Sequence, residues 1–529
     1  MVQKVAVCQV GALKEGEMRQ FAVAERKVLL ARVENKFWAI APHCPHAGAP
    51  LADGVIHDDR VVCPWHNACF SLRTGKLLEP PAFNDLTSYP TSIESETVYV
   101  ELPDEETEES VVPDLAGQDA TSVKEDRTFV IIGGGAAGCA AAQMLRQMKF
   151  TGRIVLLTTE SKPPYDRTKL SKAYLQQDKA QDPDLLRPLS FYQRYDIDLR
   201  TTAKVTKLDA KTQTITYGDG ETIGYDALLI ATGGKVRKIP MDGADLTNVF
   251  TLRQAQDARA ILEASRQAKQ VVIVGAGFIG MEVASSLNQQ GLDVTIVASN
   301  AVPFEHVLGE KVGRLMQQIH ESHGVKFRLD SKVSGFKGDG KVESVELESG
   351  EVLPADMVVV GIGVKPATDF IEGIVLDEDD KSVPVNQYLQ AAPNVYAAGD
   401  IVQFPHFMTG ESVRIEHWRL AMQHGRNAAK NMMGENVAFK SVPFFWTGQY
   451  NVNLRYIGHA EDWEDVVIKG SLEDKSFLAF YIKEQQVLAV AGIGRDRDIA
   501  AISELLGTSK MLDVNTLRAE EIDWAGQLS

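Results

Sequence analysis

Short apolar runs separated by Gly, Pro, Asn and Asp fill the first hundred residues of the chain. These runs predict β-strands joined by tight turns, and the clearest are KVAVCQV, FWAI, RVVCPW and TVYVEL. From Thr128 the pattern changes to longer apolar strands that alternate with helical segments, which is typical of an α/β architecture. After about Pro443 the runs LRYIGHA, DVVIKG, FLAFYIK and VLAVAGIG predict a meander of strands, and DIAAISELLG predicts a helix.

An acidic stretch separates the strand-rich N-terminal region from the α/β region. Its sequence, ELPDEETEESVVPDLAGQDATSVKEDR, contains proline and shows no apolar period. This composition predicts a linker at residues 104–125. We expect the linker to let the N-terminal domain move relative to the rest of the chain.

Length, charge and cysteine content exclude several classes of protein. At 529 residues the chain is too long for one core, so about three or four domains are expected. The 55 Lys and Arg residues against 72 Asp and Glu give a net charge of −17, which disfavours nucleic acid and anionic membranes as partners. The five cysteines make no disulfide framework, no secretory leader is evident, and no apolar run reaches about 18 residues. We therefore expect a cytoplasmic protein that does not span a membrane.

One stretch, APHCPHAGAPLADGVIHDDRVVCPWHNACF, concentrates soft metal ligands. It contains Cys44-x-His46 and, after sixteen residues, Cys63-x-x-His66. Two Cys and two His can hold tetrahedral zinc or a Rieske [2Fe–2S] cluster. Zinc fingers usually place two Cys in one loop and two His in another. Each loop here offers one Cys and one His, so each loop can contribute one ligand to each iron of a [2Fe–2S] cluster. The stretch resembles the Rieske domain, including the following FSLRTGKLLEPPA, and zinc remains the alternative.

The cluster site departs from the high-potential Rieske proteins that it resembles. Those proteins carry two further cysteines that join the ligand loops and a serine near the cluster, and Ala49, Trp65 and Ala68 stand at these positions here. Fewer hydrogen bonds to the cluster sulfurs predict a potential toward the low end of the Rieske range of about −150 to +300 mV. Cys69 fits no ligand position and is interpreted as a packing residue.

Two glycine-rich turns predict two dinucleotide sites. Each lies between an apolar strand and an Ala-rich or apolar helix, where glycines let the backbone approach a pyrophosphate at a helix N-terminus. The first turn has Gly133, Gly135 and Gly138, and the second has Gly275, Gly277 and Gly280. Two such turns in one chain suggest FAD together with NAD(P)H.

The first turn is followed by segments that resemble the FAD domain of ferredoxin reductases and apoptosis-inducing-factor-like oxidoreductases. These are PPYDRTKLSK, LLIATGGKVRKIP and PNVYAAGDIVQF, and later IEHWRLAMQHGRNAAKNM and VPFFWTGQY. The resemblance implies FAD contacts for Arg167, Lys172, Thr232, Gly233 and Asp400, for the segment Glu416 to Trp418, and for Trp446 against the flavin ring. Glu160 lies close to where a ribose-binding acid belongs.

The second turn would bind the nicotinamide nucleotide. The resemblance places Glu282 near the nicotinamide and Gly361 to Gly363 at the border of that ring. Relatives that prefer NADH usually have an acid after the next strand, and Ala298 stands there, followed by Ser299 and Asn300. No arginine is placed for a 2′-phosphate either, so the choice between NADH and NADPH stays open.

Taken together, the chain resembles the apoptosis-inducing factor 3 type of FAD-dependent pyridine nucleotide oxidoreductase. The implied fold is multidomain, with an all-β Rieske domain, two interleaved Rossmann-like α/β domains and an α+β C-terminal domain. The expected bounds are 1–103 for the Rieske domain, 126–250 with 373–442 for the FAD domain, 251–372 for the NAD(P) domain and 443–529 for the C-terminal, dimerisation-type domain.

The function that this architecture implies is electron transfer from NADH or NADPH through FAD to the Rieske cluster and on to an unidentified protein acceptor. Cys139 stands alone rather than in a C-x₄-C pair, so no dithiol exit is expected. The protein would position the cofactors and tune their reduction potentials, so no acid–base catalytic residue is assigned. The alternative is an NADH-responsive redox sensor with slow turnover. A homodimer is suggested by the resemblance alone.

Overall fold

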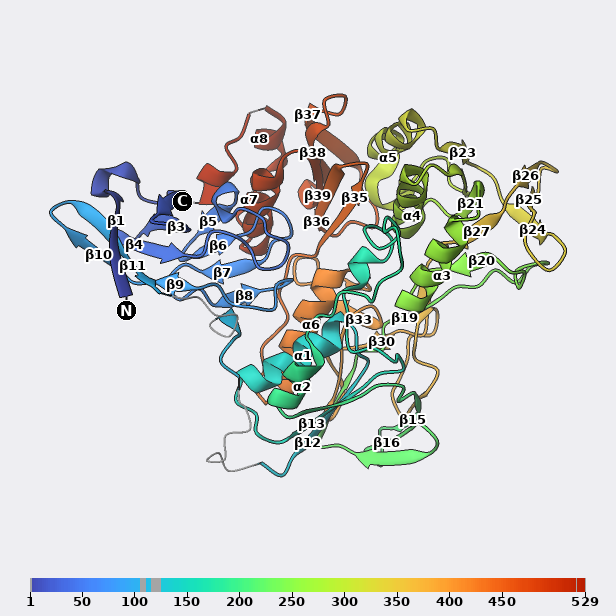
Figure 1. The fold of residues 1–529 in the computed structure, drawn as a ribbon, viewed down its shortest axis with the longest axis horizontal. Coiled ribbons are helices and arrows are strands. Elements are labelled where there is room, and N and C mark those ends of the chain that lie inside the picture. The colour runs from blue at the N-terminus through green and yellow to red at the C-terminus, as the bar shows by residue number, and fades with distance from the viewer. Residues whose placement is uncertain (1, 105–110, 116–124, 520, 529) are drawn as a thin grey trace.

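The structure is a computed structural model that describes residues 2–104, 111–115, 125–519 and 521–528. The predicted linker therefore lies largely outside the described residues, and only its ends and 111–115 are described. Within the described residues no helix is long and apolar enough to span a bilayer. Figure 1 shows an elongated molecule, with the N-terminal β domain at one end and the second α/β domain toward the other.

The N-terminal domain is built from three small antiparallel sheets. One has the order β2 (Met18–Val23), β3 (Arg26–Val33), β4 (Lys36–Ile40) and β9 (Ser88–Tyr89), and a second has β1 (Val2–Gln9), β11 (Thr97–Pro103) and β10 (Thr91–Glu94). The third has β5 (Val55–His57), β6 (Arg60–Val62), β7 (Cys69–Ser71) and β8 (Leu77–Glu79). All four strand-like runs noted in the sequence contribute to strands. The third sheet carries the ligand-rich stretch.

The first α/β domain contains a six-stranded sheet whose central strands are parallel. Its order is β14 (Ile197–Arg200), β13 (Arg153–Leu157), β12 (Thr128–Ile132), β18 (Ala227–Ile230), β32 (Val395–Ala397) and β31 (Gln390–Ala392). Its helices are α1 (Ala136–Gln147), α2 (Leu189–Arg194) and α6 (Trp418–Met432). A four-stranded sheet joins it, in the order β17 (Glu221–Gly224), β16 (Thr214–Tyr217), β15 (Val205–Asp209) and β29 (Ile371–Glu372). Three short strands, β30 (Val383–Pro384), β33 (Val402–Pro405) and β34 (Ser412–Val413), form a small sheet.

The second α/β domain is inserted into the first. Its parallel sheet has the order β20 (Val249–Thr251), β27 (Met357–Val360), β21 (Gln270–Val274), β22 (Asp293–Val297) and β23 (Lys326–Arg328). Its helices are α3 (Ala255–Ser265), α4 (Phe278–Gln289) and α5 (Glu305–Ser322), and a small sheet of β24 (Val333–Lys337), β25 (Ser344–Leu347) and β26 (Val352–Pro354) extends from it. The chain enters and leaves the insertion through the antiparallel pair β19 (Gly234–Val236) and β28 (Val364–Pro366).

The C-terminal domain is a five-stranded antiparallel sheet with helices beside it. The order is β35 (Phe444–Gln449), β36 (Val452–Gly458), β39 (Gln486–Ile493), β38 (Ser476–Lys483) and β37 (Asp465–Ser471). Helices α7 (Asp496–Gly507) and α8 (Val514–Ala519) follow. The predicted meander and helix are confirmed by these elements.

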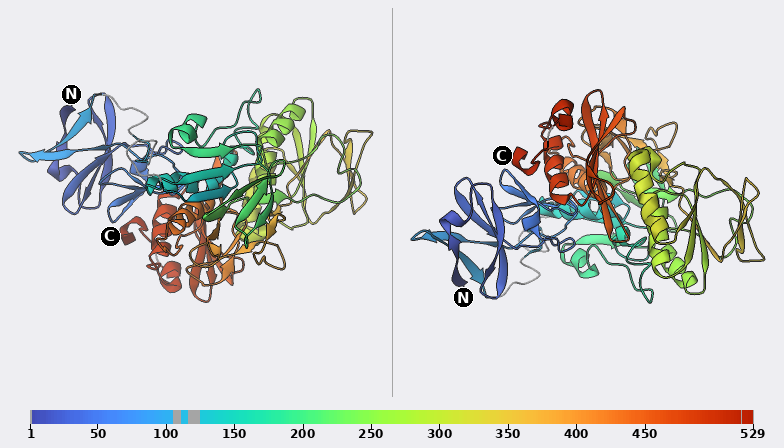
Figure 2. Two further views of the ribbon diagram at one scale, coloured as in Figure 1. Left: turned by 90° about the horizontal axis from the view of Figure 1, so that it is seen from below. Right: turned by 90° about the horizontal axis from the view of Figure 1, so that it is seen from above.

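The N-terminal domain packs directly against the C-terminal domain. Figure 1 shows β5 beside α7, and both views of Figure 2 show the blue N-terminal strands next to the red C-terminal helices. Val55 and Val62 of the N-terminal domain belong to the same buried apolar cluster as Phe444 and Ile502 of the C-terminal domain. Because this contact buries apolar surface on both sides, separating the two domains would expose a hydrophobic core.

Candidate functional site

The two ligand loops of the N-terminal domain have the same backbone design. In each loop the N–H of the cysteine donates to the carbonyl five residues later, Cys44 to Ala49 at 2.9 Å and Cys63 to Ala68 at 2.8 Å. Asn67 takes a left-handed conformation, with φ of 55°, that closes the second loop. The predicted Cys-x-His and Cys-x-x-His spacings thus fold into two matching turns.

The four predicted ligands come together as two pairs. The neighbouring thiol of Cys44 lowers the pKa of Cys63. The Nδ1 atoms of His46 and His66 approach to 3.0 Å. Burial, together with the neighbouring His46, lowers the pKa of His66 well below its usual value, which keeps this imidazole neutral and able to ligate. Two thiols and two imidazoles are the division that a Rieske cluster needs, so the residues fit this group.

A cavity of about 690 Å³ opens between the first α/β domain and the start of α3. Predicted residues that line it are Gly133, Gly135, Glu160, Arg167, Thr232, Gly233, Asp400, Glu416 and Trp418. At Gly133, where φ is +117°, an added Cβ would lie 2.1 Å from the carbonyl oxygen of Ala231, so this position requires glycine. At Gly135 an added Cβ would meet no atom within 4 Å, so the backbone is open to the cavity there. The size and the glycine-lined wall fit FAD.

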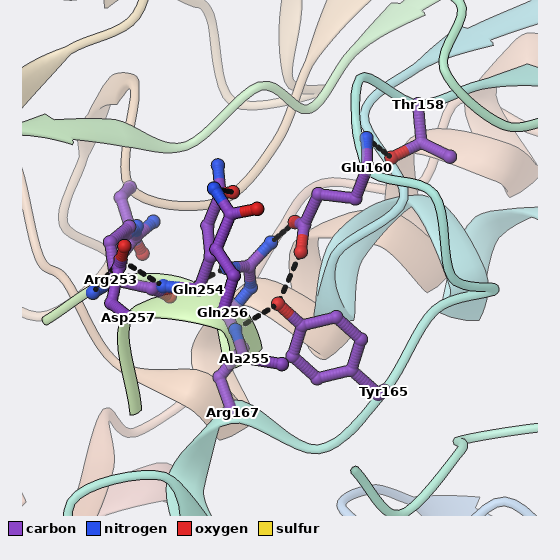
Figure 3. A network of polar contacts seen from close by, with 10 residues as sticks. Thr158, Glu160, Tyr165, Arg167, Arg253, Gln254, Ala255, Gln256 and Asp257 are labelled. Carbon is purple, nitrogen blue, oxygen red and sulfur yellow. Dashed lines mark hydrogen bonds and ion pairs between the residues drawn. The ribbon is translucent and has the colours of Figure 1, made fainter. Parts of the chain in front are cut away.

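A network of polar contacts joins the cavity to the insertion (Figure 3). Arg167 donates to the carboxylate of Glu160 and to the backbone oxygen of Arg253, the latter at 2.7 Å. Tyr165 donates its hydroxyl proton to the same carboxylate and accepts the N–H of Ala255 at 3.0 Å. Arg253 in turn donates to Asp400 at 3.1 Å. Sequence reasoning missed Tyr165 and Arg253. Tyr165 lies in the segment PPYDRTKLSK, where only Arg167 and Lys172 were assigned, and Arg253 lies in none of the segments that carried the resemblance.

Lys172 and Glu282 meet away from the residues that line the cavity. Lys172 Nζ lies 3.0 Å from Glu282 Oε2, and Thr447 donates to the other carboxylate oxygen at 2.7 Å. Glu282 is only 4% exposed, so its charge is held by these partners and by Ser171. Three segments distant in sequence, the one predicted for FAD, helix α4 and strand β35, therefore converge on one carboxylate.

The glycines of the second turn pack closely against their neighbours. Gly275 has a φ of +110°, and an added Cβ would lie 2.4 Å from the carbonyl oxygen of Gly361. At Gly280 an added Cβ would lie 2.1 Å from Gly275, whereas at Gly277 and Gly363 it would meet nothing within 4 Å. Gly138 repeats the Gly280 contact in the first turn, with an added Cβ 2.0 Å from the oxygen of Gly133. The turns thus have the same design.

The ring of Trp446 packs against the two predicted histidine ligands of the N-terminal domain. Its ring centroid is 4.2 Å from that of His66 and 6.0 Å from that of His46. Its cross-strand partner Arg455 donates to the carbonyl oxygen of Trp65 at 2.9 Å. The sequence suggested the flavin for Trp446, but it did not indicate this contact between domains, because the two partners are distant in sequence.

Three family models match the chain. The model for the Rieske [2Fe-2S] domain matches residues 3–90, pyridine nucleotide-disulphide oxidoreductase matches 127–425, and reductase C-terminal matches 444–525. The chain belongs to the pyridine nucleotide-disulphide oxidoreductase family. Within this family it carries an additional Rieske domain, which decides between a cluster and zinc in favour of the cluster.

Several relatives share this arrangement in whole or in part. Apoptosis-inducing factor 3 of Homo sapiens is 38% identical over 522 residues, which cover 96% of this chain and 85% of that protein. Rhodocoxin reductase of Rhodococcus erythropolis is 34% identical and covers 73% of this chain and 90% of its own length. The crystal structure of the covalent putidaredoxin reductase–putidaredoxin complex has a TM-score of 0.73 at 28% identity and covers 77% of this chain and 99% of that chain.

These comparisons confirm the resemblance, the multidomain fold and the class of enzyme. This member of the pyridine nucleotide-disulphide oxidoreductase family is an FAD-dependent NAD(P)H oxidoreductase, with FAD, NAD(P)H and a [2Fe–2S] cluster as its cofactors. All five cysteines of the chain are described, and all are free. Cys139 is buried in α1 beside the hydroxyl of Tyr192.

Proposed function

We propose that electrons leave this oxidoreductase through its own Rieske domain, which is docked on the reductase in the position for transfer. The contact between Trp446 and His66, at 4.2 Å between ring centroids, carries this proposal. When bound, FAD takes a hydride from the nicotinamide and gives up electrons singly, which suits a one-electron [2Fe–2S] cluster. The ligands we assign to the cluster are Cys44, His46, Cys63 and His66.

The chain's own residues bind and orient the two nucleotides. We assign the cavity residues Gly133, Gly135, Glu160, Arg167, Thr232, Gly233 and Asp400 to FAD, with Gly138 fixing the approach of α1 to its turn. We assign Gly275, Gly277, Gly280, Glu282, Gly361 and Gly363 to NAD(P)H. Both turns present backbone N–H groups at a helix N-terminus, where a pyrophosphate is stabilised. The domain bounds proposed above follow the same division.

Lys172 has a positioning role in this proposal. Its ammonium group is neutralised by Glu282, which comes from the helix that follows the NAD(P)H turn. Because the pair joins the FAD segment to that helix, it fixes how the two nucleotide sites face one another. Trp446, which the sequence suggested for the flavin ring, is assigned instead to the boundary between the reductase and the cluster.

The acceptor is proposed to be a ferredoxin-like protein that binds the Rieske domain. Relatives named as ferredoxin and rubredoxin reductases serve small electron-carrier proteins by their names, and the covalent complex named above pairs a reductase with putidaredoxin. The free thiols fit a reducing compartment, for which we propose the cytoplasm. A homodimer through the C-terminal domain is also proposed.

The proposed exit route is tested with two acceptors and a His66→Ala variant. Ferricyanide is a small one-electron oxidant that takes electrons from a flavin directly, whereas a ferredoxin requires a docked partner. We expect the variant to keep NADH-dependent ferricyanide reduction and to lose at least about tenfold in ferredoxin reduction, ~1.4 kcal/mol. Unchanged ferredoxin reduction would show that electrons leave from the flavin. Slow turnover with both acceptors in the wild-type chain would instead favour a redox sensor.

A further inference from the structure

Helix α6 contacts both redox sites with neighbouring residues. Trp418, its first residue, lines the FAD cavity, and Arg419 reaches the Rieske domain. Arg419, Gln423 and Arg426 are spaced four and three residues apart, so they share one face of the helix. All three donate to the Rieske domain, Gln423 to Glu79 at 2.6 Å and Arg426 more distantly to the carbonyls of β8.

Arg419 holds the second ligand loop directly. Its Nη2 donates to the carbonyl oxygen of Asn67 at 3.0 Å, and its Nε donates to that of Pro80 at 2.9 Å. Asn67 is the residue after His66, and on the other side of His66 the carbonyl of Trp65 accepts from Arg455. Two guanidinium groups of the reductase therefore bracket one cluster ligand.

The two arginines differ in how their charge is compensated. Arg455 forms a close ion pair with Asp496, at 2.5 Å. The nearest carboxylate oxygen of Glu79 is 4.0 Å from Arg419, and the Glu79 side chain is 42% exposed while that of Arg419 is 7% exposed. Arg419 therefore carries the less neutralised charge, and its side chain is as buried as that of Arg455. A charge in such surroundings acts strongly on its neighbours.

We propose that Arg419 sets the reduction potential of the docked Rieske cluster, raising it so that the cluster accepts electrons from FAD. The inference rests on the cluster ligands proposed above. Reduction of the cluster adds one negative charge, and a buried cation beside a ligand loop stabilises that charge. Because linkage is reciprocal, the same charge makes reduction of the cluster favour the docked domain.

The test is an EPR-monitored redox titration of the full chain with FAD and cluster bound. We expect Arg419→Gln to lower the midpoint potential by an amount equal to about a tenfold change in the reduction equilibrium, which is about 59 mV for one electron. Arg419→Lys keeps the charge and should shift the potential by less than half as much. Glu79→Gln removes a neighbouring negative charge and should shift it in the opposite direction, upward.

Arg426→Gln is the matched control. It removes a guanidinium from the same helix face, but the carbonyls that it contacts lie on β8 rather than in the ligand loop. We expect its midpoint potential to equal that of the wild type. Equal shifts in Arg419→Gln and Arg426→Gln, or no shift in Arg419→Gln, would overturn the proposal. If Arg419→Gln fails to assemble the cluster, a downward or absent shift in Glu79→Gln would overturn it equally.

The titration separates this inference from the function on which it rests. A wild-type chain without a Rieske signal would contradict the proposed ligands, and the inference would fall with them. A normal wild-type signal whose potential does not respond to Arg419 would contradict the inference alone.

Discussion

Trp446 and Arg455 are cross-strand partners on β35 and β36, and both contact the second ligand loop of the Rieske domain. The indole of Trp446 packs against the His66 ring at a tilt of 49°, and Arg455 donates to the carbonyl of the residue before His66. A single register in the C-terminal sheet therefore positions an aromatic ring and a cation at the cluster together. The C-terminal domain thus forms the docking face for the domain at the other end of the chain.

The contact of Trp446 with His66 predicts a specific loss in electron transfer. We expect Trp446→Ala to slow reduction of the cluster by about tenfold or more, equivalent to ~1.4 kcal/mol in the barrier. Reduction of the flavin by NADH should keep its rate, because Trp446 is not among the residues that line the cavity. Stopped-flow spectroscopy under anaerobic conditions separates the two phases.

The control for this prediction keeps an aromatic ring. Trp446→Phe should retain most of the wild-type rate of cluster reduction. Equal rates in Trp446→Ala and the wild type would contradict a role for this ring, and a slower flavin phase would indicate that the substitution acts on the FAD site instead.

The ligand assignment predicts different outcomes for two buried cysteines. Cys63→Ala should abolish cluster binding and leave FAD bound, because Cys63 is one of two thiols in the ligand set. Cys69→Ala should retain the cluster, because burial in an apolar cluster raises the pKa of Cys69, as expected of a packing residue. Iron and flavin analysis of the purified proteins measures both. Iron at wild-type level in Cys63→Ala would refute the assignment.

The two open glycines predict which turn binds which nucleotide. Gly135→Ala and Gly277→Ala each add a methyl group that meets no protein atom within 4 Å, so both chains should fold. We expect Gly135→Ala to weaken FAD about tenfold or more, and Gly277→Ala to weaken NADH similarly, each ~1.4 kcal/mol, because the methyl occupies space that a pyrophosphate needs.

Each of these variants serves as the control for the other. FAD affinity is measured by fluorescence titration of the apoprotein, and NADH affinity is measured by rapid reduction of the flavin. If Gly277→Ala weakened FAD and spared NADH, the two assignments would have to be exchanged.

Buried histidines predict a loss of stability in mild acid. Burial lowers the pKa of His424 to about 3, whereas an unfolded histidine has a pKa of about 6.5. Below pH ~6.5 the unfolded chain binds a proton that the folded chain refuses, so the free energy of unfolding falls as the pH falls toward 3. The slope that His424 contributes approaches ~1.4 kcal/mol per pH unit.

His424→Asn is expected to make this dependence shallower. Asparagine can still accept the N–H of Gly399, which His424 Nδ1 accepts at 3.3 Å. Denaturant unfolding at several pH values between 7 and 4.5 measures the slope. Replacement of the exposed His306 by Asn is the control and should leave the slope unchanged. An unaltered slope in His424→Asn would contradict the prediction.

Local motifs were sufficient to predict the fold class and to select residues that the structure brings together around one cavity. The Cys-x-His spacing and the glycine-rich turns encode their own backbone geometry, so Cys44, Gly133 and Gly275 could be placed without a structure. The strands of the C-terminal meander were equally clear, because β38 and β39 are buried along most of their length and therefore appear as continuous apolar runs.

The relation between domains could not be predicted from the sequence. Arg419 and Arg455 donate to backbone carbonyls, which every residue possesses, so their partners leave no pattern along the chain. The contact of Trp446 with His66 joins positions that are far apart in the sequence, so no local motif indicates it. The linker suggested a moving domain, whereas Val55 and Val62 share an apolar core with the C-terminal domain.

The most direct test of the central claim is an anaerobic EPR measurement on the full chain after addition of NADH. We expect a Rieske-type signal, because electrons from NADH reach the cluster through FAD within one molecule. NADPH, tried in parallel, reports the nucleotide preference. A signal that dithionite produces but neither NADH nor NADPH produces would contradict the claim that the docked Rieske domain receives electrons from the flavin.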